Sequence, residues 1–582
     1  MKNLTRQAVA AAVSALFAHT AAAQTTQNTT YNYQYDANGN LTQITDPLGH
    51  VTNQSYDALN RLTQQLQPAP TAGAARPAIN YGYDSQDHLI SVTDPRKLTT
   101  GYTVDGLGNQ TALTSPDTGT STKTYDAAGN LKTVTDARGK TTSYTYDALN
   151  RVTRIAYPSG TATAFEYDGG TTGAPNAAGR LTRITDESGQ TSYAYDPLGR
   201  VLTKAQTTGT GTTTKTYTVS YAYGTSGSAT GKPVSLTYPS GNQLNFSYDA
   251  AGRINGITLT PNGQGTPVPL LTAIGYTPFG GPNSWTWGNS SATAQNTYAR
   301  GVDLNGRLTG YPLGNGVTNG LMRTVTYDAA SRITGTTHSG TGSGSMAPAN
   351  FDQSFGYDNL DRLTNFTGSS TSRGYQYDQN GNRTQATFGS SSYANAIAAN
   401  SNRMTSAAGP LPAKNYSYDA AGNLTGDGNL IYGYSDRGRM MNATLAGSTV
   451  SYLYNGLGQR VQKNGPASMV PGGTVQYVYD EQGRLLGEYD ASGNALQETV
   501  YLGDMPVAVL RQADVYYVYA DHLNAPRVIT RASDNQIVWR WDNADPFGYS
   551  LPDENPGGLG VFTYNLRFPG QYYDRETGLF YN

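Results

Sequence analysis

The sequence YDAAGNLKTVTDARGKTTSYTYDALNRVT at Tyr125–Thr153 decides the fold, because most of the chain is a variation on it. Tyr35–Thr63 carries nearly the same text, and steps of 21 residues separate Tyr35 from Tyr56 and Tyr125 from Tyr146. A fixed period of this length is typical of a repeat architecture. The recurring tyrosine of each tyrosine–aspartate pair lies at Tyr35, Tyr56, Tyr83, Tyr125, Tyr146, Tyr167, Tyr195, Tyr248, Tyr327, Tyr357, Tyr377, Tyr418 and Tyr479.

One repeat unit reads as a β-hairpin. Tyr144 and Tyr146 alternate with a threonine, so a strand would place both rings on one face. Asp147 then opens a turn, and its carboxylate is expected to accept hydrogen bonds from backbone N–H groups two or three residues on. Asn150 suits the left-handed position that closes this turn. In the preceding unit, a second strand is predicted over Leu131–Thr135.

A second kind of turn ends each unit. Asp136–Gly139 repeats the Asp-to-Gly chemistry, as does Asp46–Gly49, in which Pro47 fixes the backbone at the second position. One hairpin is too small to bury its own aromatic face. Successive hairpins are therefore expected to pair edge to edge in one long sheet.

The pattern Tyr-x-Tyr-Asp-x-x-Gly-Asn-Leu-Thr, repeated over most of the chain after the first thirty residues, resembles the YD repeats of the RHS and teneurin-like family. In that family the sheet spirals into a hollow β-shell that often encloses a toxic C-terminal domain. The resemblance implies an all-β fold of repeated antiparallel β-hairpins forming a continuous spiralling sheet. Whether the shell closes on this chain alone, or stays incomplete or open, is left undecided.

The C-terminal residues carry the most specific match. From Val475 the spacing changes, and Leu566–Asn582 resembles the RHS-repeat-associated core motif. In the family this motif continues to an Asp-Pro-x-Gly element whose aspartates support self-cleavage. Those aspartates have no counterpart here, so neither a protease nor a toxin is carried over. We expect a repeat shell over 24–474 and a truncated core region over 475–582, with a remainder in a neighbouring reading frame as an alternative.

The first 23 residues have the pattern of a signal peptide. Lys2 and Arg6 precede an apolar run, Ala8–Phe17, and Ala21–Ala23 supplies a small-residue cleavage site. A helix of the folded protein is the alternative. The rest of the chain has no run of about 18 apolar residues, which a membrane span requires. A secreted protein is expected, extracellular or at the cell surface after periplasmic transit.

Composition excludes several function classes. The chain has no cysteine, so it holds neither disulfides nor a thiolate site. Its formal net charge is −2 and no basic cluster occurs, which does not suit nucleic acid. With 45 tyrosines, tyrosine is expected to replace the aliphatic core.

The register is interrupted in places. The inserts at 68–77 and 169–179 are predicted to be surface loops. A strand is predicted over Tyr217–Tyr223, and irregular strands over Ile254–Met322, where Trp285 and Trp287 alternate.

Candidate chemistry is sparse. Asp36–Asn40 resembles the start of a calcium loop, but Leu41 and Pro47 stand where such a loop needs Gly and Glu, so turn capping is favoured. No carboxylate pair stands out for glycoside hydrolysis. His522 is expected to be a hydrogen-bonded group in the wall. We predict no catalytic, cofactor-binding or metal-binding residues, no cofactor, and no enzymatic activity.

Two functions remain open from the sequence. The first is a secreted, non-enzymatic shell that encloses or presents a partner polypeptide, such as a toxin encoded downstream. The second is a cell-surface adhesion or carbohydrate-binding protein, in which exposed tyrosines stack on a glycan. Nucleic acid and a membrane span are not expected.

Overall fold

The structure is a computed structural model that describes residues 29–170, 173–209, 214–278, 280–288, 296–316, 320–342, 347–542, 545–548 and 550–582. The predicted signal peptide at 1–23 lies outside the described residues. Strands dominate, as predicted, and only three short 3-10 helices are described: η3 (Gly227–Ala229), η4 (Pro261–Gly263) and η6 (Pro348–Phe351). In the described part of the chain, no helix is long and apolar enough to cross a membrane.

Three large antiparallel sheets follow one another along the chain. The first contains β1 (Asn32–Tyr35), β2 (Leu41–Thr45), β3 (Val51–Tyr56), β4 (Leu62–Leu66), β5 (Ala78–Tyr83), β6 (Leu89–Thr93), β7 (Thr99–Val104), β8 (Gln110–Ser115), β9 (Gly119–Tyr125), β10 (Leu131–Thr135), β11 (Thr141–Tyr146), β12 (Val152–Ala156), β13 (Ala162–Tyr167), β14 (Leu181–Asp186), β15 (Gly189–Tyr195), β16 (Val201–Thr208), β17 (Lys215–Tyr223), β18 (Pro233–Thr237), β19 (Gln243–Tyr248), β20 (Ile254–Thr260), β21 (Val268–Tyr276), β22 (Pro282–Trp287) and β23 (Thr297–Ala299).

The second sheet contains β24 (Gly301–Val302), β25 (Leu308–Leu313), β26 (Leu321–Tyr327), β27 (Ile333–Ser339), β28 (Gln353–Tyr357), β29 (Leu363–Gly368), β30 (Ser372–Tyr377), β31 (Arg383–Phe388), β32 (Ser391–Ile397), β33 (Met404–Ala408) and β34 (Lys414–Asn415). The third contains β35 (Ser417–Tyr418), β36 (Leu424–Gly426), β37 (Leu430–Tyr434), β38 (Met440–Leu445), β39 (Ser448–Tyr454), β40 (Arg460–Asn464), β41 (Thr474–Tyr479), β42 (Leu485–Tyr489), β43 (Ala495–Leu502), β44 (Met505–Arg511), β45 (Asp514–Ala520), β46 (Pro526–Arg531) and β47 (Ile537–Arg540). A separate C-terminal hairpin consists of β48 (Tyr572–Asp574) and β49 (Leu579–Tyr581).

Each strand of a large sheet pairs with the next strand of the chain, so every hairpin neighbours the hairpin that follows it in sequence. The register shifts at the last residue before a Tyr–Asp turn; for example, Thr145 pairs with Arg154 while Tyr146 pairs with Val152. Such bulges increase the local twist of a sheet. A twisted ribbon of hairpins then curves instead of staying flat.

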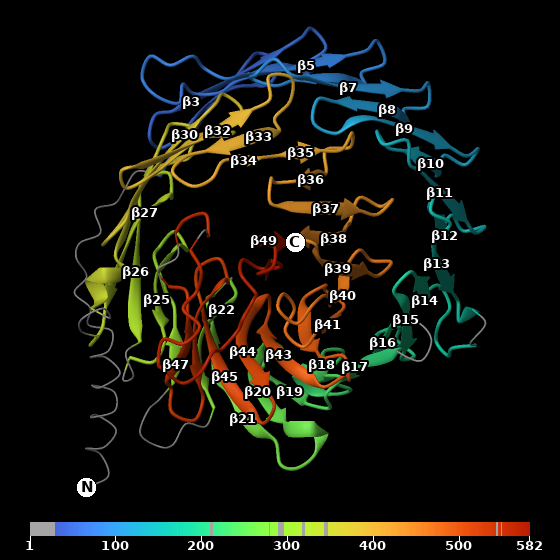
Figure 1. Cartoon of the computed structure of the whole chain (residues 1–582), viewed down its shortest axis with the longest axis vertical. Coiled ribbons are helices and arrows are strands. Elements are labelled where there is room, and N and C mark those ends of the chain that lie inside the picture. The colour runs from blue at the N-terminus through green and yellow to red at the C-terminus, as the bar shows by residue number, and fades with distance from the viewer. Residues whose placement is uncertain are drawn as a thin grey trace.

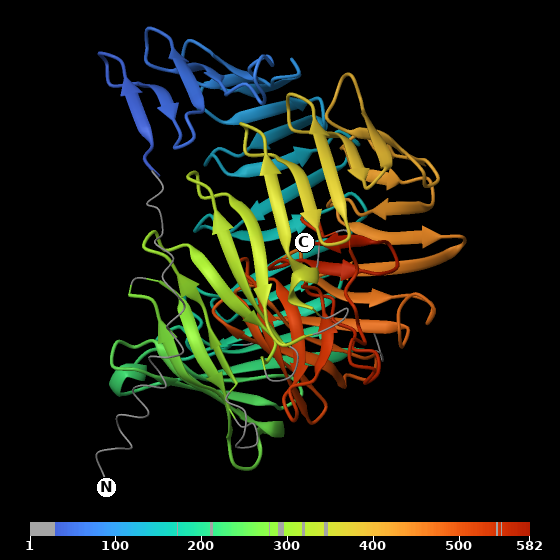
Figure 2. The same cartoon turned by 90° about the vertical axis from the view of Figure 1, so that its left-hand side faces the viewer.

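The ribbon winds through about two rings. The first, from β1 to about β27, runs around the outside in Figure 1, and the second, from about β28 to β47, returns beside it on the inner side. The perpendicular view in Figure 2 shows the same spiral, with β48 and β49 near its middle. The sheets are not closed into a barrel. This is the spiralling sheet of hairpins predicted from the sequence.

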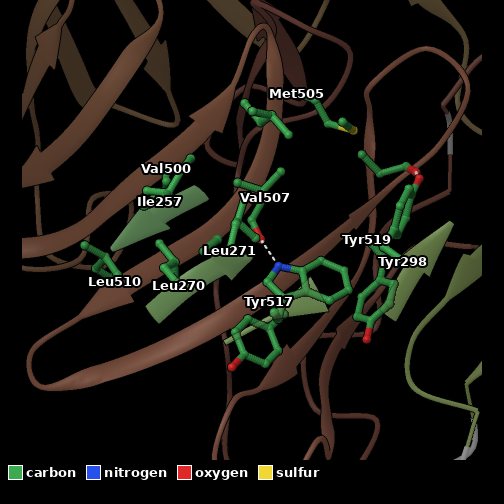
Figure 3. Packing of buried hydrophobic residues seen from close by; sticks show 14 of the residues in the cluster. Ile257, Leu270, Leu271, Tyr298, Val500, Met505, Val507, Leu510, Tyr517 and Tyr519 are labelled. Atoms are coloured by element: carbon green, nitrogen blue, oxygen red, sulfur yellow. Dashed lines mark hydrogen bonds between the residues drawn. The ribbon is translucent and has the colours of Figure 1, made fainter. Parts of the chain in front are cut away.

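Burial differs sharply between the first twelve strands and the region where the two rings meet. Over β1–β12 no strand residue is fully buried, so both faces of this sheet are accessible to water. The largest core instead joins the end of the first ring to the second ring, where Leu271 and Tyr298 pack near Val507 and Tyr519 (Figure 3). The prediction that tyrosine replaces the aliphatic core is therefore wrong for this core, which is rich in Leu, Val, Ile and Trp as well as Tyr.

The interrupted segments form strands, as predicted. β17 contains the predicted strand Tyr217–Tyr223. The strands within Ile254–Met322 are irregular, as expected: β20 to β22 pair with register shifts, and β23 and β24 are short. The alternating Trp285 and Trp287 are both buried. The 68–77 insert is a loop, as predicted, but it also touches the second ring.

Candidate functional site: the shell wall, its seam and the C-terminal anchor

Each Tyr–Asp turn is held by its aspartate. Asp147 Oδ1 accepts hydrogen bonds from the backbone N–H groups of Leu149 and Arg151, both at 2.9 Å, and Oδ2 accepts one from Arg151 Nε at 2.7 Å. Asn150 has φ 60°, the left-handed conformation expected for it. The bond from the Arg151 backbone, the largest cause, lowers the pKa of Asp147. Capping is confirmed, with donors two and four residues on rather than two and three.

The tyrosine of each unit ties neighbouring hairpins together. The Tyr146 hydroxyl donates to the backbone carbonyl of Leu131, the first residue of the second strand in the preceding hairpin, at 2.7 Å. The same bond recurs at Tyr56, Tyr83, Tyr125, Tyr167, Tyr195, Tyr223, Tyr248, Tyr276, Tyr327, Tyr357, Tyr377, Tyr418, Tyr479 and Tyr501. We call this series the tyrosine ladder. Sequence reasoning treated these rings as packing groups and missed their hydroxyls.

In eight of the turns an arginine links the turn to the next tyrosine. Arg151, which pairs with Asp147, lies with its guanidinium 4.4 Å from the centre of the Tyr167 ring. The same contact joins Arg61 to Tyr83, Arg200 to Tyr223, Arg253 to Tyr276, Arg307 to Tyr327, Arg332 to Tyr357, Arg362 to Tyr377 and Arg484 to Tyr501. Such cation–π contacts stabilise exposed sites by about 0.5–1 kcal/mol each. The sequence signal for these arginine–tyrosine contacts is the arginine that stands four residues after the aspartate of the turn.

The two rings meet edge to edge along a seam. We call the turns between one hairpin and the next the return turns. The return turns of the first ring contact the turns within the hairpins of the second ring. These are Tyr–Asp turns or turns at the equivalent position, such as those closed by Ala398 and Arg403 and by Ser435 and Arg439. Arg96 donates to the carbonyls of Ser401 and Ala398, at 2.7 and 2.6 Å. Farther along, Arg138 donates to the carbonyls of Ser435 and Asp436, at 3.0 and 2.9 Å.

The seam runs from the 68–77 loop to β16. Asn359 donates to the carbonyls of Ala69 and Pro70. The backbone N–H of Ser159 donates to Asp436 Oδ2 at 2.7 Å, and Lys204 Nζ donates to the carbonyl of Asp480. Most of these contacts use backbone carbonyls, so they depend on the shape of each turn.

The second ring takes fewer residues than the first. Arg96 and its partner Ser401 are 305 residues apart in the chain, whereas Tyr311 and its partner His522 are 211 apart. The second ring therefore tightens and moves inside the first toward its end, where Trp287 Nε1 donates to the carbonyl of Val507 (Figure 3).

The C-terminal hairpin is fixed to the second ring by buried charges. Asp574 accepts from Arg460 Nη1 at 2.5 Å and from Lys463 Nζ at 3.0 Å, and Lys463 also pairs with Glu576. Arg460 is 2% exposed. Its guanidinium lies over the rings of Tyr452, Tyr477, Tyr572 and Tyr581, at 5.2, 5.1, 5.2 and 4.4 Å. We call this cluster the C-terminal anchor. Nothing in the sequence analysis pointed to it.

A cavity of about 230 Å³ lies beside the anchor, between the Tyr–Asp turn of Gln482 and Arg484 and the C-terminal residues Leu566 and Phe568. It is the size of a small ligand or a few side chains. Its lining includes the charged residues Arg484, Asp504 and Arg567.

The residues weighed earlier for chemistry have structural roles. Asp36 Oδ1 accepts from the backbone of Asn38 and Asn40, which is turn capping, as favoured. His522 hydrogen-bonds the Tyr311 hydroxyl, as expected for a wall residue, and burial lowers its pKa. Within the described ranges, no group of three His, Asp or Glu residues is placed to hold a metal ion.

Family models match most of the chain. The model described as Teneurin YD-shell matches residues 282–581, and the model described as RHS Repeat matches residues 35–72, 83–120, 125–162, 176–213 and 228–264. The chain belongs to the RHS/YD-repeat family. No curated protein matches it.

The fold of this RHS/YD-repeat chain is similar to those of solved structures. One is the crystal structure of TcdB2-TccC3, with 18% identity, a TM-score of 0.74, and coverage of 96% of this chain and 33% of that one. Another is a Photorhabdus luminescens Tc holotoxin pore, with 17% identity, a TM-score of 0.74, and coverage of 95% and 31%. The chain thus spans about a third of the length of these structures. At this identity the similarity establishes the RHS shell fold and nothing finer.

Proposed function

We propose that this chain is a secreted RHS-type shell that encloses a partner polypeptide and has no catalytic activity of its own. The observation that carries the proposal is the single-layer wall over β1–β12, in which no strand residue is fully buried. A sheet in a compact domain buries at least one face against another layer. A wall with two wetted faces instead suits a container.

The position of the C-terminus supports the same role. It lies near the middle of the molecule in both perpendicular views (Figures 1 and 2), and the C-terminal anchor fixes the hairpin that precedes it. A polypeptide continuing from Asn582, or held beside it, would begin inside the wall. Similarity to structures named as TcdB2-TccC3 and as a Tc holotoxin pore agrees with a toxin-related cargo.

Protection of an attached polypeptide tests the proposal. An unstructured, protease-sensitive segment of about 100 residues is fused after Asn582 in one variant and before Gln24 in another. Proteinase K should cut the N-terminal fusion quickly and the C-terminal fusion far more slowly. Equal cleavage rates would contradict enclosure. Secretion is tested separately, by comparing the culture medium of cells that express the chain with and without residues 1–23.

A glycan-binding role is a second candidate, favoured by one observation. Tyr33 and Tyr35 lie on one face of β1 and Tyr31 directly precedes this strand; they are 53%, 62% and 46% exposed. Exposed rings in such a row are able to stack on sugars. Glycan-array binding by the wild type that is lost in Tyr33→Ala would support this role, and an array without signal would reject it.

A further inference from the structure

The cavity of about 230 Å³ beside the C-terminal anchor has a lining rich in rings. Two tyrosines of the ladder, Tyr479 and Tyr501, line it together with Phe568 and the pyrrolidine rings of Pro506 and Pro526. The two tyrosine hydroxyls are engaged, because each donates to a backbone carbonyl. The rings therefore offer the cavity flat apolar surfaces, against which another ring packs well.

Arg567 also lines this cavity and is a buried cation, 3% exposed. Its Nη1 donates to the carbonyls of Tyr564 and Leu566, at 2.7 and 3.0 Å. Its Nη2 is buried and has no hydrogen-bond partner among the described residues. The described residues include every aspartate and glutamate of the chain, and none of these carboxylates pairs with Arg567. The side chain thus holds a buried charge without a counter-ion.

Aromatic rings replace only part of the water that this guanidinium has lost. Its central carbon lies 5.5, 5.1 and 5.2 Å from the ring centres of Trp539, Trp541 and Tyr573. Cation–π contacts attract the guanidinium but do not neutralise it. Burial, the largest cause, lowers the pKa of Arg567 to about 10, so the side chain is still protonated at neutral pH. Such a charge is costly until an anion pairs with it.

Two other charged residues line the cavity. Arg484 is paired with Asp480, with Nη2 and Oδ2 2.6 Å apart. Asp504 is exposed on the turn between β43 and β44, where water screens its carboxylate. Among the charged residues of the lining, Arg567 is therefore the one that is both buried and unpaired.

We propose that this cavity binds a small monocarboxylate with a flat apolar body, whose carboxylate pairs with Arg567 and whose body packs among the rings. The planar guanidinium matches the two oxygens of a carboxylate. The volume suits one ring, since an engineered cavity of about 150 Å³ in another protein binds benzene. A phosphate dianion would need more donors than one arginine in an apolar lining supplies.

This ligand chemistry has two sources. One is a free aromatic acid, and the other is the C-terminal carboxylate of a polypeptide that ends in an aromatic residue. Neither source requires that the shell enclose a cargo. The site is measured on the empty protein, so its failure leaves the container role to its own test.

Isothermal titration calorimetry on the full chain tests the proposal. The probes are benzoate and 3-phenylpropionate as free acids and N-acetylglycyl-phenylalanine as a polypeptide end, each compared with its uncharged amide. At least one acid should bind at one site per chain. Its amide should bind more than about tenfold more weakly, because it cannot neutralise Arg567. Binding of the free acids assigns the site to the first source, and binding of the peptide alone assigns it to the second.

Three variants locate the site. Arg567→Gln should raise the dissociation constant of the acid by more than about tenfold. Asp504→Asn should lower it about two- to fivefold, because it removes a like charge from the lining. Asp514→Asn makes the same change of charge at an exposed residue outside the lining, at the start of β45, and should leave the dissociation constant unchanged. Circular dichroism confirms that each variant is folded, and Asp504→Asn, at an exposed turn, gives the test if Arg567→Gln does not fold.

Several outcomes would overturn the proposal. Absence of binding by all three acids at millimolar concentration does so, and so does equal affinity for an acid and its amide. Unchanged affinity in a folded Arg567→Gln variant, or equal effects of Asp504→Asn and Asp514→Asn, would place any bound acid outside this cavity.

Discussion

The Tyr146 hydroxyl donates a 2.7 Å hydrogen bond to the backbone carbonyl of Leu131, fifteen residues earlier in the chain. The two residues belong to different hairpins, so the bond fastens one repeat unit to the one before it. Because the same bond recurs along the tyrosine ladder, over separations of 14 to 24 residues, each tyrosine fastens its own hairpin to the preceding one whatever the length of the intervening segment.

Substitutions at Tyr146 separate the ring from its hydroxyl. Tyr146→Phe removes the hydrogen bond and should lower the free energy of unfolding by about 1 kcal/mol. Tyr146→Ala also removes the ring and should lower it by about 3 kcal/mol. Asp147→Ala, which loses the turn cap, should fall between the two. Urea unfolding measures all three. If Asp147→Ala were the most damaging, the rings would not be the main support of the wall.

Acid should weaken the wall within a defined pH range. Backbone N–H donors, the largest cause in each case, lower the pKa of Asp57, Asp126, Asp147 and Asp249 in the folded protein. A carboxyl whose folded pKa is depressed contributes stability above its unfolded pKa of about 4, and this contribution is lost as pH falls through the folded pKa. The urea midpoint should therefore drop steeply below about pH 4. A midpoint that stayed constant down to pH 2 would show that the turn carboxylates contribute nothing.

The seam depends on arginines in the return turns. Arg138→Ala should open the seam locally, because the carbonyls of Ser435 and Asp436 lose their donors. Hydrogen exchange should speed up in the turns around residues 136–139 and 435–438 and stay unchanged in distant β44. Arg154→Ala, at an exposed strand position on neighbouring β12, is the control. Equal exchange in the two variants would mean that the seam is held by other contacts.

The C-terminal anchor should be sensitive to loss of one charge. Asp574→Asn leaves Arg460 and Lys463 buried without their shared carboxylate, and breaking a buried pair typically costs about 3–5 kcal/mol. We expect the hairpin 572–581 to become accessible to trypsin. Asp534→Asn disrupts an exposed pair with Arg531 and should change little. Resistance of the Asp574→Asn hairpin to trypsin would contradict the role of the anchor.

Local features were predictable from the sequence, and long-range ones were not. The turn at Asp147 and the strand Leu131–Thr135 follow from alternation and turn chemistry within a few residues, and the structure has both. The seam partner of Arg138 lies 297 residues away, and no local pattern gives the number of hairpins per ring. The C-terminal anchor was missed for the same reason. Arg460 and Asp574 are distant in the sequence, and only the fold of the second ring brings them together.

The central claim is that two rings of one ribbon lie edge to edge. Ser159 and Asp436 test it most directly, because they are 277 residues apart in the chain yet joined by a 2.7 Å hydrogen bond across the seam. In the cysteine-free chain, Ser159→Cys/Asp436→Cys should form an intramolecular disulfide under mild oxidation, seen as faster migration on a non-reducing gel. Ser159→Cys/Thr449→Cys, with its second cysteine in β39, should not. Failure of the first pair to form a disulfide in the folded protein, or equal oxidation of both pairs, would contradict the two-ring shell.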